Sequence, residues 1–311
     1  MAEMTTVDFS QLTCGTRDER SKIVREIGRA CEERGFFALV NHGVPASLRA
    51  AVTAAMEDFF ALPAEEREEY MGKQLFDPIR HGAGRTLTAD GFEYRRDFLR
   101  IFVHPTLHSP VKPLHFSAIC EEYGRKTREI AHELLRAIWE SLDLEEGFVG
   151  AIMDVRSGHQ ILIGNSYPSG PGPNLGLGLP AHSDIALLSI VMQEGSTSGL
   201  QVFHQGHWNL IEFIPDSLLV HVGDLLEIVS NGKYKSLLHR VTLNSTSARM
   251  SIVTAIGPNP EDRVVPLPEL VRGSGSSSAK FRSIKYIEFV ELTARNPFDK
   301  AALNLVRLCD V

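Results

Sequence analysis

The hydrophobic pattern of the chain changes near Gly158, from a helical period to a period of two. After this glycine, short apolar runs separated by turn residues occupy 160–167, 186–193, 218–222, 234–243 and 249–257. Side chains alternate between two faces along a strand, so these runs predict strands. Turns such as Asn231-Gly232 lie between them, and the spacing indicates an antiparallel sandwich or barrel.

The residues before Gly158 favour helices. Residues 18–34 place Ile23, Ile27 and Cys31 on one helical face and end at Gly35, which predicts an amphipathic helix with a glycine stop. The same period returns at 45–62 and 117–142, and a short strand is expected at 36–43. We predict an α+β protein with a mainly β core.

Three segments are expected to form one compact unit. Residues 1–157 make an N-terminal helical region with flanking strands, and residues 158–271 make the catalytic core. Residues 272–311 begin with the loop "RGSGSSS" and continue into a lid helix at "FRSIKYIEFVELTARN". A chain of 311 residues, 43% hydrophobic, can bury a substantial core.

Composition argues against several classes of partner. The 32 basic and 39 acidic residues give a net charge of −7 without a basic cluster, so we expect no nucleic acid. The four cysteines are scattered and fit neither a disulfide framework nor a zinc cage. Neither a signal peptide nor an apolar run of about 20 residues is evident. We expect a cytoplasmic monomer that binds a small molecule and no membrane.

A cluster of metal-binding residue types is predicted by "PAHSDIALLSIVMQ" and "YKSLLHRVTL". His182 and Asp184 are two residues apart and share a face if they lie on a strand. His239 stands in an apolar stretch where an imidazole needs a partner. Two imidazoles and one carboxylate form the facial triad of non-haem Fe(II) oxygenases. Zinc hydrolases use the same donors, so these three residues, the metal triad, do not select the metal by themselves.

Two further pairs have the same spacing. Arg249 and Ser251 in "SARMSIVTAIG" place a guanidinium and a hydroxyl on one strand face, an arrangement that suits a carboxylate. Asn165 and Tyr167 in "GNSYPSGPGP" repeat it, and the phenol can donate to the same anion. Singly, Arg249 also fits a structural ion pair and Tyr167 fits core packing. Jointly, the pairs predict a co-substrate that carries a carboxylate.

Six short segments follow one another along the chain in this order: "GFFALVNHGVP", "NSYP", "HSD", "GLQV", "VGDLLEIVSNGKYKSLLHRV" and "RMSI". Together they resemble the plant-type 2-oxoglutarate/Fe(II)-dependent dioxygenases, the superfamily that includes isopenicillin N synthase. The resemblance runs over nearly the whole chain. It implies a distorted double-stranded β-helix, or jelly roll, flanked by helices.

The resemblance also implies roles for the residues named above. The metal triad is expected to bind Fe(II). Arg249, Ser251 and Tyr167 are expected to hold the 2-oxoglutarate carboxylate remote from the metal, with Asn165 near the site. Members of the family consume O2 and decarboxylate 2-oxoglutarate to succinate, with ascorbate in a supporting role.

The oxidant so formed attacks an unactivated C–H bond, and hydroxylation, desaturation, demethylation or ring closure can follow. The expected substrate is a small, fairly apolar specialised metabolite such as an alkaloid, terpenoid or phenolic. Two alternatives stay open. One is an oxidase of the same fold that uses no 2-oxoglutarate, and the other is a non-catalytic protein that binds a small ligand.

Two aromatic segments are candidates for the substrate pocket, although such stripes also suit a plain core. Arg95 and Arg96 lie within the first segment, and this position suits either contact with an acidic substrate or a pair of charges exposed to solvent. The candidates are Phe92, Tyr94, Phe98 and Phe102 from the first segment and Phe281, Ile284 and Phe289 from the second.

The chain departs from the family pattern at three places. It starts close to the "VDFS" strand, without the longer leader of plant members, and the usual cysteine after Tyr167-Pro168 is replaced. His221 stands where relatives usually carry asparagine, and we expect a core histidine with satisfied hydrogen bonds there rather than a ligand. His204 and His207 are expected at an exposed hairpin turn.

Overall fold

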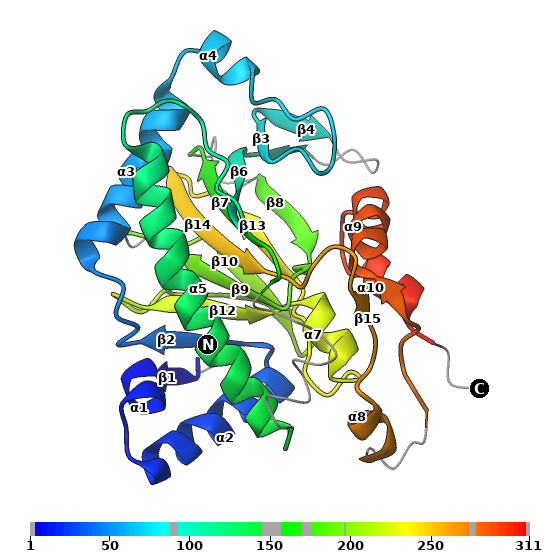
Figure 1. Ribbon diagram of the computed structural model, residues 1–311. Coiled ribbons are helices and arrows are strands. Elements are labelled where there is room, and N and C mark those ends of the chain that lie inside the picture. The colour runs from blue at the N-terminus through cyan, green and yellow to red at the C-terminus, as the bar shows by residue number, and fades with distance from the viewer. Residues whose placement is uncertain are drawn as a thin grey trace.

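The structure is a computed structural model that describes residues 4–87, 93–144, 157–169, 176–195, 197–273 and 278–308. Within these ranges the strands form two large sheets and one small pair (Figure 1). The larger sheet has the order β1 (Thr6–Asp8), β2 (Phe36–Val40), β12 (Leu218–Val222), β9 (Leu188–Met192), β14 (Arg249–Ile256), β7 (Gln160–Tyr167), β6 (Asp97–His104) and β3 (Ile79–Gly82). The smaller sheet has the order β11 (His207–Leu210), β10 (Leu200–His204), β13 (His239–Thr242), β8 (Leu177–His182), β5 (Glu93–Arg95) and β4 (Arg85–Leu87). The pair consists of β15 (Arg263–Val264) and β16 (Ile284–Lys285).

Helices lie on both sides of the strands (Figure 1). The long helices α3 (Ala46–Ala61) and α5 (Phe116–Ser141) pack against each other and against β7 and β14, while α2 (Arg17–Glu33) packs against α5. On the other side, α9 (Tyr286–Arg295) and α10 (Ala301–Val306) lie near the C-terminal end of β8. The remaining helices are short: α1 (Phe9–Thr13), α4 (Ala64–Glu68), α7 (Asp224–Val229) and α8 (Pro268–Gly273).

Helix α2 begins and ends where the local sequence specifies. The Thr16 hydroxyl accepts a hydrogen bond from the Glu19 N–H, and the Glu19 carboxylate accepts one from the Thr16 N–H, a capping box. At the other end Gly35 has φ +77°, and its N–H donates to the carbonyl of Ala30. Ile23, Ile27 and Cys31 are buried, as the helical period predicts.

The ladder between β7 and β14 divides the interior into two parts. Arg249 pairs with Tyr167 at one end and Ile256 with Gln160 at the other. Leu162 and Ile252 are fully buried in the core that α3 and α5 cover. Gly164 permits close approach of α3, because a Cβ there would lie 2.6 Å from the Met56 sulfur. The alternate residues of both strands face the cavities described below.

The predicted fold class is confirmed, since this is an α+β arrangement around a mainly β core. Strands β7 and β12 have the predicted bounds, whereas the run predicted at 234–243 is a strand only from His239 to Thr242. The prediction missed α7, and it was wrong about Asn231-Gly232. These residues, with φ of 50° and 74°, follow α7 instead of joining two strands. The Gln205-Gly206 turn does join two strands, β10 and β11.

One hydrophobic cluster draws residues from all three expected segments. Phe37 and Ile138 come from the first, Val229 from the second, and Phe289 and Leu303 from the third. In the part of the chain that the structure describes, no helix combines the length and apolarity needed to cross a bilayer.

A buried carboxylate fastens α10 and the segment after it to the core. Glu227 on α7 is 1% exposed and accepts hydrogen bonds from Lys300 Nζ, Arg307 Nη2 and the Ser236 N–H, each at 2.7 Å. A buried charge is tolerated when it is paired and fully hydrogen-bonded. Glu227 therefore links α7 to the chain around α10.

We expect Glu227→Gln to lower the free energy of unfolding by roughly 2–4 kcal/mol. Lys300 and Arg307 both lose their anionic partner, and Lys300 stays largely buried. The matched control is Glu261→Gln. Glu261 pairs with Lys285 at 2.9 Å but is 67% exposed, so its loss is worth about 0–1 kcal/mol. Urea denaturation of both variants measures the difference. Equal midpoints for the two would contradict this account of Glu227.

Candidate active site

The metal triad assembles where β8 and β13 pair. His182 and His239 are directly opposite each other in the ladder, and their ring centroids are 4.2 Å apart. Asp184 is not on the strand as predicted, because β8 ends at His182. The carbonyl of Asp184 accepts a hydrogen bond from the Asp224 N–H at 2.7 Å. The carboxylate therefore lies beside the two rings just beyond the end of the strand.

The two imidazoles are oriented for metal binding. His182 Nδ1 lies 2.8 Å from the carbonyl of Pro180, and His239 Nδ1 lies 3.1 Å from that of Leu237. A carbonyl only accepts, so each Nδ1 carries the proton and each Nε2 keeps its lone pair. The Nε2 atoms lie 3.9 Å and 3.7 Å from Asp184 Oδ1. One ligand atom from each residue lies within 4.8 Å of the others, in a group that could hold a metal ion.

The protonation states suit the same purpose. Burial lowers the pKa of His239 to about 3, and His182 nearby adds to the effect. Burial also lowers the pKa of His182. For Asp184, burial raises the pKa but His239, His221 and His182 together bring it below its usual range. Neutral imidazoles and an ionised carboxylate are the forms that bind metal.

His221 is buried, as expected, but it is not an ordinary core histidine. Its Nδ1 lies 3.4 Å from Asp184 Oδ2, on the carboxylate oxygen that does not face the other two histidines. Its ring packs edge-on to His239, with centroids 4.8 Å apart, and its Nε2 has no hydrogen-bond partner among the described residues. His221 therefore orients Asp184 from behind, as outer residues commonly do at metal sites.

The second group assembles on the ladder between β7 and β14. Arg249 lies opposite Tyr167, and Ser251 lies opposite Asn165. The guanidinium of Arg249 lies over the Tyr167 ring, 5.2 Å from its centroid, and Arg249 Nε donates to Gln193 Oε1 at 2.7 Å. Burial lowers the pKa of Arg249, while Tyr167 raises it. The two pairs found separately in the sequence thus form one group of four residues, Arg249, Ser251, Tyr167 and Asn165, called the arginine cluster below.

One donor of this cluster has no partner. Arg249 is 5% exposed, and its Nη1 atom is buried without a hydrogen-bond partner among the described residues. A buried guanidinium with an unsatisfied N–H suits an anion in the adjoining space. Gly178 on β8 makes room for Tyr167, because a Cβ there would lie 2.6 Å from the Tyr167 ring.

The metal triad and the arginine cluster line the same cavity. Its wall includes residues of both sheets, so the sheets face each other across it. All seven residues predicted as metal or co-substrate ligands line it: Asn165, Tyr167, His182, Asp184, His239, Arg249 and Ser251.

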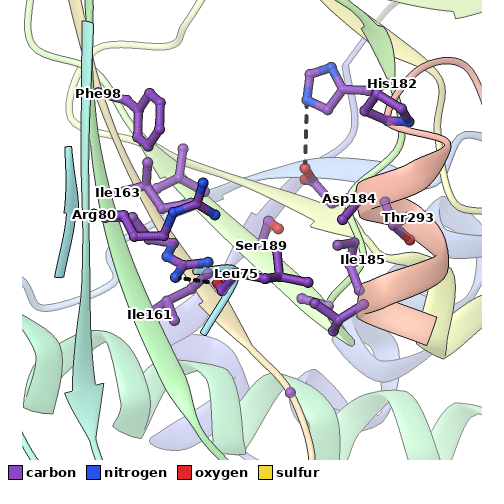
Figure 2. A pocket seen from close by; sticks show the side chains of 18 of the residues that line it. Leu75, Arg80, Phe98, Ile161, Ile163, His182, Asp184, Ile185, Ser189 and Thr293 are labelled. Carbon is purple, nitrogen blue, oxygen red and sulfur yellow. Dashed lines mark hydrogen bonds and ion pairs between the residues drawn. The ribbon is translucent and has the colours of Figure 1, made fainter. Parts of the chain in front are cut away.

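A larger cavity of about 470 Å³ continues on the other side of the triad (Figure 2). His182 and Asp184 lie on one wall, and Phe98, Ile161 and Ile163 lie on the wall across from them (Figure 2). The volume is within the usual range for small-molecule sites, about 300–1,000 Å³. The two cavities meet at the triad, since His182 and Asp184 line both.

Some of the residues predicted to contact the substrate line this cavity. Tyr94, Phe98 and Phe102 line it, whereas Phe92 lies outside the described residues. The expected lid is not formed by Phe281, Ile284 and Phe289, because these side chains are buried in the core and do not line the cavity. Instead α9 presents a different face, with Tyr286, Ile287, Val290, Thr293 and Ala294. The expected helix began too early: α9 starts at Tyr286, so Phe281 and Ile284 lie outside it, and Phe289 is on the face of α9 that packs into the core.

Sequence reasoning missed several polar residues of the site. Gln193 ends the apolar run after Asp184 and holds Arg249. Arg95 pairs with Glu93 and does not line either cavity, whereas Arg96 lines both and donates to Asn165 Oδ1 at 3.1 Å. Arg80 and Arg100 line the larger cavity from β3 and β6. The only signal in these two strands is one arginine beside apolar residues, next to Ile79 in β3 and between Leu99 and Ile101 in β6, and any half-exposed strand can have this pattern.

Comparison with known proteins gives the family. The sequence profile of the 2OG-Fe(II) oxygenase superfamily matches residues 158–258, and that of the non-haem dioxygenase in morphine synthesis N-terminal region matches residues 4–119. The chain is 43% identical over 304 residues to 2-oxoglutarate-dependent dioxygenase 19 of Oryza sativa subsp. japonica, covering 97% of this chain and 89% of that protein. It is 34% identical over 295 residues to flavanone 3-dioxygenase 2 of the same plant, covering 93% and 85%.

A solved structure agrees in fold. The crystal structure of JOX2 in complex with 2OG, Fe and JA matches with a TM-score of 0.87 and 26% identity, over 98% of this chain and 89% of that one. The jelly roll implied by the resemblance is therefore confirmed. With the two profiles, the relatives and the His-Asp-His group in agreement, the chain belongs to the 2-oxoglutarate/Fe(II)-dependent oxygenase superfamily and is an iron- and 2-oxoglutarate-dependent dioxygenase.

Proposed function

We propose that this dioxygenase oxidises a small, largely apolar specialised metabolite, with Fe(II) held by the metal triad and 2-oxoglutarate held by the arginine cluster. The observation that carries the proposal is the continuity of the two cavities at His182 and Asp184. A co-substrate on one side and a substrate on the other then reach the same metal.

The triad supplies three ligands on one side of the ion. When bound, Fe(II) supplies the activation of O2 that is coupled to decarboxylation of 2-oxoglutarate. The chain's own part is placement. His182 and His239 offer Nε2, Asp184 offers Oδ1, and His221 holds the second oxygen of that carboxylate.

The arginine cluster orients the co-substrate. The unpartnered Nη1 of Arg249 and the hydroxyls of Ser251 and Tyr167 converge on one small space beside the triad. A carboxylate placed there neutralises the buried guanidinium. Gln193 fixes the guanidinium through Nε and leaves Nη1 to the ligand.

The larger cavity favours an apolar substrate. Phe98, Phe102, Ile161, Ile163 and Val253 line it, and side chains of α9 cover it. Apolar walls exclude water from the reacting bond and limit side reactions. Similar proteins include flavanone 3-dioxygenase 2 of rice and a flavonol synthase/flavanone 3-hydroxylase of Petunia hybrida, whose names refer to small aromatic metabolites.

Loss of a triad ligand tests the metal site. We expect His182→Ala to reduce Fe(II)-dependent succinate release by more than about 100-fold, since even residues that only support metal ligands cost 10–100-fold. Metal content after Fe(II) loading should fall in parallel, with an unchanged circular dichroism spectrum. His207→Ala on the exposed β10–β11 turn is the control and should behave as wild type. Full metal content in His182→Ala would refute the assignment.

The positioning role of His221 predicts a graded effect. His221→Phe keeps an aromatic ring but removes the donor to Asp184, so Fe(II) affinity should fall about 10–100-fold. His221→Asn restores a donor and should lie closer to wild type. Competition titration with a chelator measures this independently of turnover. Equal affinities in wild type and the phenylalanine variant would show that the contact does not position Asp184.

The arginine cluster predicts a selective change in KM. Arg249→Met should raise the KM for 2-oxoglutarate roughly 10- to 150-fold, the equivalent of a charged hydrogen bond worth about 1.5–3 kcal/mol. Arg249→Lys keeps the charge but loses the planar fork and should be intermediate. Arg240→Met, which removes a guanidinium stacked on Trp208 in the smaller sheet, is the control. An unchanged KM in Arg249→Met, or substrate oxidation without 2-oxoglutarate, would reject this assignment.

A further inference from the structure

Arginine side chains enter the larger cavity from the wall across from the metal triad. Arg80 on β3 and Arg100 on β6 are cross-strand partners, and both line this cavity. Figure 2 shows Arg80 beside Ile161 and Ile163, with Asp184 and His182 on the opposite side of the space. Most of the other lining residues are apolar. Two adjacent cations in such surroundings require an explanation.

Neither guanidinium is fully satisfied by the protein. The Nε atoms of Arg80 and Arg100 are both buried without a hydrogen-bond partner among the described residues. Arg100 Nη2 donates to the carbonyls of Leu75 and Asp77, each at 2.9 Å, which fixes its position. For Arg80 no hydrogen bond or ion pair is formed within the described ranges.

Asp77 acts electrostatically on both arginines, but its carboxylate is hydrogen-bonded to backbone groups. Asp77 Oδ2 accepts hydrogen bonds from the N–H groups of Lys73 and Gln74, at 2.7 and 2.8 Å. No ion pair within 4.0 Å joins Asp77 to either arginine in the described part of the chain. Burial, and then the neighbouring Arg80, lower the pKa of Arg100 to about 10. The pair therefore carries excess positive charge in an apolar space, which is costly without an anion.

We propose that the substrate is an apolar carboxylic acid whose carboxylate binds Arg80 and Arg100, which places the carbon skeleton between that wall and the metal triad. This inference rests on the proposed function and names its substrate class. A guanidinium fork suits a carboxylate, and two of them hold it firmly. The aromatic rings of Phe98, Phe102 and Tyr286 line the space that the skeleton would fill. Arg96 also lines this cavity, and its Nε is buried without a partner among the described residues, but its Nη1 donates to Asn165 on the co-substrate side.

The test compares acids with their neutral amides. The probes are naphthalene-1-acetate, 3-phenylpropanoate and cinnamate, each paired with its primary amide, and binding to the protein loaded with Mn(II) and 2-oxoglutarate is measured by calorimetry. We expect wild type to bind at least one acid 10-fold or more tightly than its amide. Arg80→Met should remove this preference, and Arg80→Lys should keep part of it.

The control is Arg95→Met on strand β5 of the smaller sheet. Arg95 pairs with Glu93 at 2.8 Å and does not line the cavity, so its loss should leave the preference intact. A second readout is thermal stability. Arg80→Met should melt higher than wild type without ligand, because a buried unpaired charge is removed.

The outcomes separate this inference from the proposed function. If the amides bind as well as the acids, if no acid in the panel binds, or if Arg80→Met keeps the preference, the acidic substrate class is wrong. In that case 2-oxoglutarate binding and succinate release still stand. If 2-oxoglutarate itself fails to bind the Mn(II) protein, the proposed function fails, and the acid preference at Arg80 is judged from the same titrations without 2-oxoglutarate.

Discussion

The ladder between β7 and β14 is the constraint on which the rest of the site depends. Its eight paired positions run from Arg249 opposite Tyr167 to Ile256 opposite Gln160. Because side chains alternate, one face of the ladder packs under α3 and α5. The other face lines the two cavities one after the other along the strands. A slip of one residue would exchange the two faces and bury the co-substrate ligands in the core. Packing on the helical side therefore holds the register of the active site.

Buried charges in this protein are compensated in different ways. Burial raises the pKa of Asp184, but three neighbouring histidines bring it below its usual range. Arg249 donates to Gln193 and lies over the Tyr167 ring, yet its Nη1 is unsatisfied, and Arg80 has no hydrogen-bond or ion-pair partner within the described ranges. Glu227 is fully paired within the protein and stabilises the fold. A buried charge that is fully paired within the protein, such as Glu227, thus stabilises the fold, whereas one with an unsatisfied donor, such as Arg249, is suited to bind a ligand.

The sequence predicted the donors better than their arrangement. His182, Asp184 and His239 were found from residue type and setting, and Asp184 lies beside His182 as the spacing predicts, although β8 ends at His182. The lid face was misplaced because α9 starts at Tyr286, so Phe281 and Ile284 pack inward. His221 was taken for a core residue, since its contact with Asp184 joins residues 37 positions apart. Local pattern carries no information about such pairs.

The sequence by itself determined the fold class, the main helices and strands, and the seven polar residues of the metal and co-substrate sites, because periodicity and residue chemistry are local properties. Only the tertiary structure decided that Arg249 lies opposite Tyr167, that His221 supports Asp184, and that Arg80 and Arg100 share a wall of the cavity. These relations depend on strand register and on packing between distant segments. The substrate class that we propose depends on that packing, because Arg80 and Arg100 can bind one carboxylate only if both line the same apolar cavity.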